Sequence, residues 1–500
     1  MFSEYILSPI HRSLKSRSQN NAFFINDTYF SYNDLLESIS KIRSAVQAVS
    51  SDSNNFGLVA NDDIETYASI IALWLQGYAY VPIHPRYPIE RSLEIFRQAG
   101  VEVVLDSSLN SQFRSLRTIE SKGLKFESDN LIPLDVSDQA FAYILFTSGS
   151  TGRPKGVPIS RGNLGAFMKA FWDVGFEIDE NDRCLQCFDL TFDVSVQSFL
   201  VPISRGACIY TIPHDRIKPS YAYSLMEEHK LTFGAMAPSM VRFLKPYFDE
   251  ISLPNLKYNI LTAEASPLGL IEEWSNCIPN AVIYDFYGPT EATIYCTYSQ
   301  FRRNQGNKHL NGMMTIGKPM VGISAVIIDE NGKLMPANHK GELCVAGKQV
   351  TQGYWGNPEK NRDSFINIQV GSQTYKFYKT GDICFLDDEG DLMYAGRKDY
   401  QVKVQGFRVE LGEIEYHARE FLKGQQAIAV LLERNSGNTE IVLCVEVDEL
   451  NKDELMKYLK SVMPYYMVPS KIIELEQMPL NINGKIDRNH IKNDISQYEK

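Results

Sequence analysis

A loop rich in glycine and hydroxyl groups carries the strongest chemical signal in this sequence. It reads Thr-Ser-Gly-Ser-Thr-Gly-Arg-Pro-Lys-Gly over residues 147–156 and follows the apolar segment 142–146. Its three glycines let backbone amides converge on an anion, four hydroxyls add donors, and Lys155 adds a positive charge. It is not the P-loop of GTPases, because Pro154 stands where that motif requires its second glycine. We expect phosphate to contact Thr147, Ser148, Gly149, Ser150, Thr151, Gly152 and Lys155.

Other residue types that could do chemistry stand in weaker patterns. Cys184 and Cys187 form a CxxC spacing, but no second pair lies at a metal-binding distance along the chain. Their apolar neighbours favour a buried strand over a redox or zinc site. His84 and His214 lie in no motif, which favours structural roles for both.

The glycine-rich loop resembles the signature loop of the acyl-adenylate-forming enzymes, a family of acyl-CoA synthetases, luciferases and peptide-synthetase adenylation domains. Further segments resemble the family's motifs in the same order along nearly the whole chain. They are Tyr287-Gly288-Pro289-Thr290-Glu291, Gly341-Glu342-Leu343 with Gly353-Tyr354, Tyr378-Lys379-Thr380-Gly381-Asp382, Gly396-Arg397-Lys398-Asp399, Gln401-Val402-Lys403, Gly412-Glu413-Ile414-Glu415 and Asn483-Gly484-Lys485-Ile486-Asp487-Arg488. The last three resemble amino-acid adenylation domains more closely than acyl-CoA synthetases.

The resemblance implies a reaction in which a carboxylate attacks the α-phosphorus of ATP and pyrophosphate leaves. Lys485 would bridge the carboxylate and the α-phosphate, Thr290 would donate to the α-phosphate, and Glu291 would bind Mg²⁺. Together these three are the predicted catalytic residues. ATP and Mg²⁺ are therefore the expected cofactors.

Contacts to the adenosine part are implied at a second group of positions. Asp382 would accept both ribose hydroxyls, Tyr287 would stack on adenine, and Arg397 would contact ribose or phosphate. The predicted nucleotide contacts outside the glycine-rich loop are Ala263, Glu264, Asp285, Phe286, Tyr287, Asp382 and Arg397. Asp285 stands where relatives carry Asn, and the segment Thr262-Ala263-Glu264 stands where many carry Gly-Gly-Glu.

The choice of acid is implied by the segment Phe192-Asp193-Val194-Ser195, which resembles the family's FDxS segment. Asp193 would pair with the α-ammonium group of an amino acid, because a buried carboxylate is costly without a cation. The predicted substrate contacts are Asp193, Val194, Gln197, Ala235, Ile260, Thr262, Phe286, Ile294, Tyr295 and Lys485, with Phe192 as the gate.

Within that pocket, the combination of Asp193, Val194, Gln197 and Ile260 resembles the code of proline-activating domains. Stand-alone D-alanine ligases of the cell-wall pathway usually carry Leu and Met at the second and third of these positions. We therefore expect a small neutral amino acid, with L-proline first and alanine or glycine next. Two alternatives remain. Asp193 argues against an acyl- or aryl-CoA ligase, and the intact lysines and acids of the motifs argue against a catalytically silent binding or scaffold protein.

The expected acceptor is the phosphopantetheine thiol of a separate carrier protein, because no carrier domain follows the terminal motif. Coenzyme A is less expected, since no basic site for its 3′-phosphate is evident. Asp399 matches the family's hinge, and Lys403, Gly406 and Phe407 match the loop that faces the thiol. A hinge is needed because Lys485 and the thiol cannot occupy the same place.

The elements that must position these residues alternate between strand and helix. Apolar segments at 57–60, 79–83 and 101–105 read as strands and 65–75 as a helix, which favours an α/β fold with parallel sheets. Shorter strands follow after about residue 310. We expect an N-terminal adenylate-forming domain over 1–398, with a β-rich subdomain at about 310–398, and a mobile α+β domain over 399–500.

Composition narrows the class further. The chain has 500 residues, 44% hydrophobic and 22% charged, with a net charge of −11, which disfavours nucleic acid and anionic membrane as partners. The longest apolar stretch, 68–83, is interrupted by Gln76 and Gly77 and is too short to span a bilayer. With no signal peptide evident, we expect a cytoplasmic protein whose eight cysteines are reduced.

Overall fold

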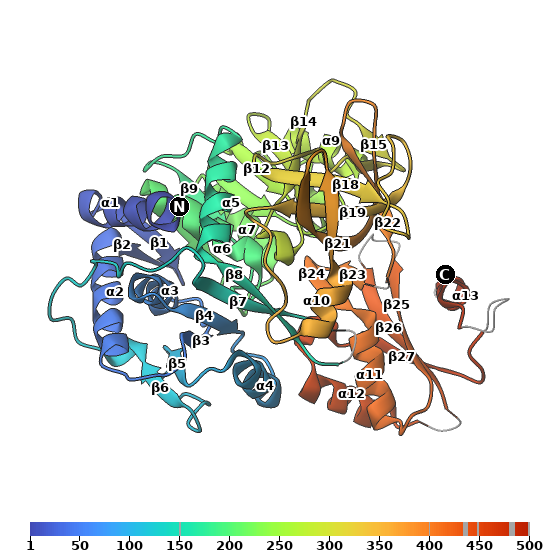
Figure 1. The fold of residues 1–500 in the computed structure, drawn as a ribbon, viewed down its shortest axis with the longest axis horizontal. Coiled ribbons are helices and arrows are strands. Elements are labelled where there is room, and N and C mark those ends of the chain that lie inside the picture. Colours follow the sequence, from blue (N-terminus) through green and yellow to red (C-terminus); the bar gives the residue numbers. More distant parts are fainter. Residues whose placement is uncertain (150–151, 400, 434–438, 448–449, 480–485, 499–500) are drawn as a thin grey trace. The chain divides into compact units, whose positions relative to one another are not determined.

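The computed structural model describes residues 1–149, 152–399, 401–433, 439–447, 450–479 and 486–498. These residues form two compact units, which we describe separately. The first comprises Met1–Pro85, Phe96–Leu145 and Gly156–Lys398, and the second comprises Arg86–Ile95, Phe146–Lys155 and Asp399–Lys500. The mixed α/β class predicted from the sequence is confirmed (Figure 1).

A nine-stranded sheet is the largest layer of the first unit (Figure 1). Its inner strands run parallel and are mostly buried, with β11 buried along its whole length, as expected for strands covered on both faces. In spatial order the strands are β17 (Lys318–Pro319), β14 (Thr297–Phe301), β13 (Val282–Tyr287), β12 (Tyr258–Leu261), β11 (Phe233–Met236), β9 (Arg183–Gln186), β10 (Cys208–Thr211), β1 (Asn21–Ile25) and β2 (Thr28–Ser31).

A second, six-stranded sheet is parallel around β3 and β4. In spatial order it contains β6 (Arg117–Glu120), β5 (Val103–Asp106), β3 (Asn55–Val59), β4 (Ala79–Ile83), β7 (Phe141–Thr147) and β8 (Lys155–Ser160). The strand predicted at 79–83 has those bounds, and the one predicted at 101–105 begins two residues later.

In the described part of residues 1–398, ten α-helices are interspersed along the chain with the strands of these two sheets and of the β-rich part that follows. They are α1 (Ser8–Ser16), α2 (Tyr32–Gln47), α3 (Ile64–Gln76), α4 (Ile89–Ala99), α5 (Arg161–Asp173), α6 (Asp193–Arg205), α7 (Lys218–Glu228), α8 (Pro238–Leu244), α9 (Leu268–Cys277) and α10 (Pro358–Ser364). Helix α3, buried from Ile64 to Leu75, lies beside α2 (Figure 1) and is capped by the side chain of Asp63. It ends at Gly77, whose φ of +90° is a glycine conformation.

Antiparallel strands form the β-rich part expected after about residue 310. They are β18 (Ile323–Ile328), β19 (Gly341–Gly347), β20 (Phe365–Val370), β21 (Gln373–Leu386) and β22 (Leu392–Arg397), with the small pair β15 (His309–Leu310) and β16 (Met313–Met314). Strands β21 and β22 pair Asp382 with Arg397. This register places two predicted nucleotide contacts side by side.

The C-terminal part of the second unit is the α+β module expected from the sequence. Its elements are β23 (Gln401–Val404), β24 (Phe407–Glu410), α11 (Leu411–Phe421), β25 (Ala427–Glu433), β26 (Thr439–Glu446), α12 (Lys452–Val462), β27 (Lys471–Leu475) and α13 (Arg488–Tyr498). Strands β25, β26 and β27 form a three-stranded sheet. Apolar side chains of this sheet pack against Ile491 and Ile495 of α13.

Candidate active site

A buried carboxylate follows the end of β13. Glu291 has no exposed surface, and the Tyr354 hydroxyl donates to its Oε1 at 2.6 Å. Tyr354 and Tyr378 in turn share a hydroxyl contact of 3.2 Å. This network holds the carboxylate in one orientation. A hard oxygen ligand fixed in this way fits the Mg²⁺ role predicted for Glu291, which stays a prediction. Thr290 precedes it in the same helical turn and is half-buried.

Three predicted adenosine contacts form one hydrogen-bonded group. The Tyr287 hydroxyl donates to Asp382 Oδ2, and Arg397 Nη1 lies 2.8 Å from Asp382 Oδ1. Arg397 Nη2 also donates to the carbonyl of Thr380 at 3.3 Å. Burial, followed by the charge of Asp382, raises the pKa of Tyr287, so this phenol remains a donor. Each carboxylate oxygen keeps a second lone pair, which leaves acceptor capacity for ribose hydroxyls.

Residues 263, 264, 285 and 286 lie at the ends of adjacent strands. Asp285 pairs with Leu261 in the β12–β13 register, and both Asp285 and Phe286 are buried. Glu264 accepts hydrogen bonds from the amide and hydroxyl of Ser239, both at 2.9 Å. Ala263 has a φ of +69°, a left-handed conformation that glycine adopts at less cost. This accounts physically for the glycine that many relatives carry there.

Asp193 begins helix α6 and is 7% exposed. A carboxylate in the first helical turn is stabilised by the helix dipole. Burial, followed by the charge of Asp193, raises the pKa of Tyr80, Tyr143 and Tyr295. The rings of Tyr80 and Tyr143 lie 5.6 Å apart. Three neutral phenols of the first unit are therefore near enough to Asp193 to interact with its charge.

Three of the predicted substrate contacts pack together through the ring of Tyr295. The Tyr295 hydroxyl donates to Gln197 Oε1 at 3.3 Å, and the ring of Phe286 lies 4.9 Å from that of Tyr295. Among the residues that the structure describes, Gln197 Nε2 has no hydrogen-bond partner although the residue is fully buried. The remaining predicted contacts, all buried, are Val194, Ala235, Ile260, Thr262 and Ile294. Phe192, the predicted gate, is the half-buried residue before α6.

The backbone beside this pocket has little spare room at Gly288. A Cβ atom there would lie 2.3 Å from the carbonyl oxygen of Ile294, so no other residue fits without a shift. Thr293 and Ile294 have φ values of +58° and +73°. The turn after β13 is thus strained, and it presents Ile294 and Tyr295 to the core.

The glycine-rich loop binds protein carboxylates within the second unit. The amide of Gly149 donates to Glu413 Oε2 at 3.0 Å, and Lys155 lies 3.3 Å from Glu410 Oε1. The Ser148 hydroxyl donates to the carbonyl of Arg408 and accepts from the amide of Glu410, each at 3.1 Å. The loop therefore already recognises anionic oxygens, the property predicted for phosphate.

Other members of that loop have different surroundings. Gly152 lies against Tyr416, where a Cβ atom would come within 2.2 Å of the ring. Thr147 Oγ1 is buried and has no hydrogen-bond partner among the described residues. The predicted contacts Ser150, Thr151 and Lys485 lie outside the described residues, so their roles stay predictions.

The predicted hinge and thiol-facing loop lie together in the second unit. Asp399 Oδ1 accepts from the amide of Gln401 at 3.2 Å. Lys403 pairs with Arg408 across the β23–β24 hairpin, whose two-residue turn has positive φ at Gln405 and Gly406. Phe407 stacks on Tyr466 with ring centroids 4.1 Å apart. Movement about Asp399 stays a prediction.

Several residues of these groups were not predicted from the sequence. Tyr354 was part of a recognised motif, but nothing indicated its contact with Glu291, 63 residues earlier. Tyr80 and Tyr143 lie in apolar strands that gave no sign of a role. Glu413 lies in a recognised motif, but its contact with the glycine-rich loop becomes evident only in the fold.

Most of the chain matches the model of one known protein family. The family model described as AMP-binding enzyme matches residues 10–355. The chain belongs to this family. The resemblance to acyl-adenylate-forming enzymes stated from the motifs is thereby confirmed.

Individual relatives cover nearly the whole chain. Tyrocidine synthase 3 of Brevibacillus parabrevis is 30% identical over 94% of this chain, which spans only 7% of that protein. The D-alanine--D-alanyl carrier protein ligase of Bacillus velezensis is 28% identical, with 98% of this chain and 99% of the ligase covered. The crystal structure of the Vibrio cholerae adenylation domain AlmE in complex with glycyl-adenosine-5'-phosphate has a TM-score of 0.86 at 24% identity, covering 98% and 97% of the two chains. This last likeness establishes the fold.

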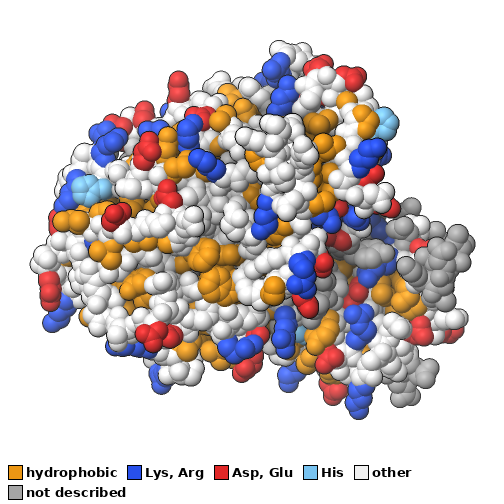
Figure 2. Space-filling view, viewed as in Figure 1, with side chains coloured by type: hydrophobic (Ala, Val, Ile, Leu, Met, Phe, Trp, Pro, Cys, Tyr) orange, Lys and Arg blue, Asp and Glu red, His pale blue; other side chains and the backbone are white. Residues whose placement is uncertain are grey.

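The distribution of surface charge and the polarity of the helices are relevant to the expected partners. On the face in Figure 2, basic and acidic side chains are interspersed over the part of the chain that is described. Among the described residues, no helix is both long and apolar enough to cross a membrane.

Proposed function

We propose that the protein activates an amino acid as its aminoacyl adenylate and then transfers the aminoacyl group to a carrier-protein thiol. In the first step, a carboxylate oxygen bonds to the α-phosphorus of ATP, and the bond to the bridging oxygen of pyrophosphate breaks. In the second step, the thiol sulfur bonds to the acyl carbon, AMP leaves, and the thiol gives up its proton.

The position of Asp193 carries this proposal. It is a buried carboxylate at the start of α6, in the segment that resembles the family's ammonium-binding motif. An α-ammonium group would neutralise the charge of Asp193, while Phe286, Tyr295 and Gln197 would orient the rest of the amino acid. Acids without an amine would leave this charge uncompensated, which disfavours acyl and aryl substrates.

The other groups have assigned parts in the same step. Glu291 would hold Mg²⁺, which supplies charge neutralisation beside the phosphates when bound. Asp382, Tyr287 and Arg397 would orient the ribose and adenine. Lys485 would place a positive charge between the two reacting anions.

A small neutral amino acid suits the pocket. Tyr295 contacts both Gln197 and Phe286, and such large side chains favour a short substrate side chain. The residues Asp193, Val194 and Gln197 favour L-proline by their likeness to the proline code. The ligase relative matched along its full length, whose name specifies D-alanine, supports D-alanine, and the glycyl adenylate in the AlmE structure supports glycine.

The acceptor that we propose is a phosphopantetheinylated carrier protein acting as a separate chain. The D-alanine--D-alanyl carrier protein ligase, which this chain covers to 99%, supports such an acceptor. The hairpin of Lys403, Gly406 and Phe407 would face the thiol after rotation about Asp399. Free coenzyme A is the competing acceptor.

An ATP–pyrophosphate exchange panel tests the class. It includes both enantiomers of proline and alanine, glycine, 2-hydroxybenzoate and a fatty acid, with Lys485→Ala as the inactive control. We expect a small amino acid to give the highest exchange and Lys485→Ala to reduce it by on the order of 10²–10³. Exchange led by 2-hydroxybenzoate or the fatty acid would contradict the proposed class.

A further inference from the structure

Three side chains of the metal-ligating types follow the carboxyl ends of three parallel strands. His84 directly follows β4, Asp189 lies in the loop after β9, and His214 follows β10. Strands β9 and β10 are parallel neighbours, while β4 belongs to the other sheet of the first unit. Ligands in α/β proteins bind at this end of parallel strands. The topology therefore brings residues far apart in sequence to one place.

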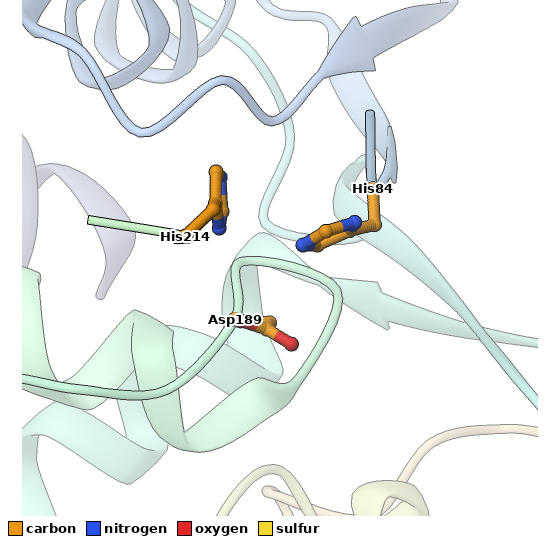
Figure 3. A group of neighbouring side chains, drawn as sticks. All are labelled: His84, Asp189 and His214. Atoms are coloured by element: carbon orange, nitrogen blue, oxygen red, sulfur yellow. The ribbon is translucent and has the colours of Figure 1, made fainter. Parts of the chain in front are cut away.

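The three side chains are grouped around a common space (Figure 3). One ligand atom from each of them, a ring nitrogen or a carboxylate oxygen, lies within 4.8 Å of the others. The two imidazole rings meet edge to face with centroids 4.6 Å apart. His84 and Asp189 are buried, and His214 is half-buried. A small cavity of about 10 Å³ beside Asp189 and His214 provides space for about one water-sized species.

Charged side chains of both signs line this cavity. Asp62 and Asp189 supply carboxylates, and Lys218 supplies an ammonium group. Cys187 also lines the cavity, and its side chain is buried.

We propose that His84, Asp189 and His214 bind one zinc-class divalent ion at a site separate from the nucleotide-binding residues. Two imidazoles and a carboxylate, with water as the fourth ligand, are a common zinc set, whereas Mg²⁺ prefers oxygen donors. Zinc bonds of about 2.0–2.2 Å require the three ligand atoms to come closer together than 4.8 Å. Rotation of the two imidazoles would supply this movement, and it would shift His214 Nε2 relative to the Ala60 carbonyl oxygen, which lies 3.2 Å away.

Lys218 is the natural competitor of such an ion. Its Nζ lies 2.7 Å from Asp189 Oδ1, and its side chain is 28% exposed. A metal ion on the carboxylate would repel this ammonium, which can turn toward solvent. Because His84 follows one sheet and the other two ligands follow the second, the bound ion would also join the two sheets and stabilise the folded state.

The test is calorimetric titration of the EDTA-treated full chain with ZnCl₂, without nucleotide. We expect one equivalent to bind, and we expect His84→Asn and His214→Gln each to weaken binding at least 10- to 100-fold, the loss that even an outer-sphere partner causes. Lys218→Met should tighten binding about two- to fivefold, since a partly exposed ion pair is lost. A folding defect cannot produce this tighter binding. Excess Mg²⁺ should leave the zinc isotherm unchanged.

A matched control uses His490, which lies 3.2 Å from Asp494 one helical turn away on α13 and is 59% exposed. His490→Ala should bind zinc as the parent does. Cobalt(II) provides a second readout, because tetrahedral nitrogen and oxygen ligation gives visible bands without a thiolate charge-transfer band. The proposal is overturned if no stoichiometric zinc binds, if His84→Asn and His214→Gln bind it like the parent, or if cobalt shows thiolate ligation.

Discussion

Asp189 and Asp193 lie four residues apart in the sequence but face different chemical surroundings. Asp189 lies beside Lys218, His84 and His214. Burial acts to raise the pKa of Asp189, but Lys218 and then His84 lower it below its usual value. The charge of Asp193 acts on the phenols of Tyr80, Tyr143 and Tyr295, whose pKa values are raised by burial and then by Asp193.

Because their neighbours differ, we interpret these two buried carboxylates as having different roles. Basic side chains stabilise the charge of Asp189, so this residue serves the fold and the proposed metal site. The charge of Asp193 instead acts on three buried phenols, which remain neutral. We therefore interpret Asp193 as the carboxylate that selects the substrate, and the following changes test that contrast.

Removing the carboxylate of Asp193 should have the largest effect. Loss of one partner from a desolvated charge pair costs roughly 2–5 kcal/mol, which corresponds to a rise of about 30- to 3000-fold in the KM for the amino acid. The KM for ATP should change little in Asp193→Ala. Steady-state pyrophosphate exchange measures both constants, and equal rises in both would remove the ammonium role.

Ionisation of Asp62, which lines the same small cavity as Asp189, should have the next largest effect. Burial raises the pKa of Asp62 from 3.8 to about 6, although the Tyr67 hydroxyl opposes this. The folded state thus favours the protonated acid, and this stabilisation is present below about pH 4 and is lost as the pH rises through about 6. Asp62→Asn keeps an acceptor for Tyr67 and does not ionise. It should raise the free energy of unfolding at pH 8 by at most about 3 kcal/mol.

Urea unfolding at pH 4 and pH 8 measures this effect, with zinc absent. The gain of Asp62→Asn over the parent should appear at pH 8 and shrink at pH 4. A gain of the same size at both pH values would mean that ionisation of Asp62 is not its cause.

Tyr295→Phe should have a smaller effect on the Asp193 side. It removes a neutral hydrogen bond to Gln197, worth about 0.5–1.5 kcal/mol, so kcat/KM for the amino acid should fall about 2- to 12-fold. Tyr298→Phe is the matched control, because Tyr298 stacks on the other neighbour, Phe286, at 5.3 Å. If the two variants lose activity equally, the Gln197 contact has no special part in substrate binding.

Asp189→Asn should have the smallest effect on catalysis. The substitution preserves shape and removes the charge that Lys218 and the histidines face. We expect the KM for the amino acid to stay within about threefold of the parent, since Asp189 is assigned to the other site. An increase as large as that of Asp193→Ala would erase the contrast between the two carboxylates.

Much of the fold was predictable because burial leaves a direct mark on sequence. The strand Ala79–Ile83 and the helix Ile64–Gln76 stand where their apolar segments predict them, since both are buried along almost their whole length. The family motifs likewise predicted nucleotide-binding roles for Tyr287, Asp382 and Arg397. Strand register then places Asp382 beside Arg397, whereas the contact of Tyr287 with Asp382 joins two different sheets.

The remaining site geometry depends on tertiary packing that no local pattern encodes. His84 and His214 appeared structural because each stands alone in the sequence, and only the meeting of two sheets places them beside Asp189. Tyr143 reaches the surroundings of Asp193 for the same reason. The contact of Gly149 with Glu413 spans 264 residues and is invisible in either segment alone.

The most direct test of the account compares the preferred amino acid with its oxygen analogue on the parent and on Asp193→Ala. The analogue is the 2-hydroxy acid for alanine or glycine and tetrahydrofuran-2-carboxylate for proline. The two substrates differ only in oxygen for the ammonium nitrogen, so their ratio of kcat/KM isolates the interaction of that nitrogen with Asp193. We predict a ratio of roughly 30- to 3000-fold on the parent that falls to about one on the variant. The same ratio on both proteins would contradict the assignment of Asp193 as the ammonium-binding carboxylate.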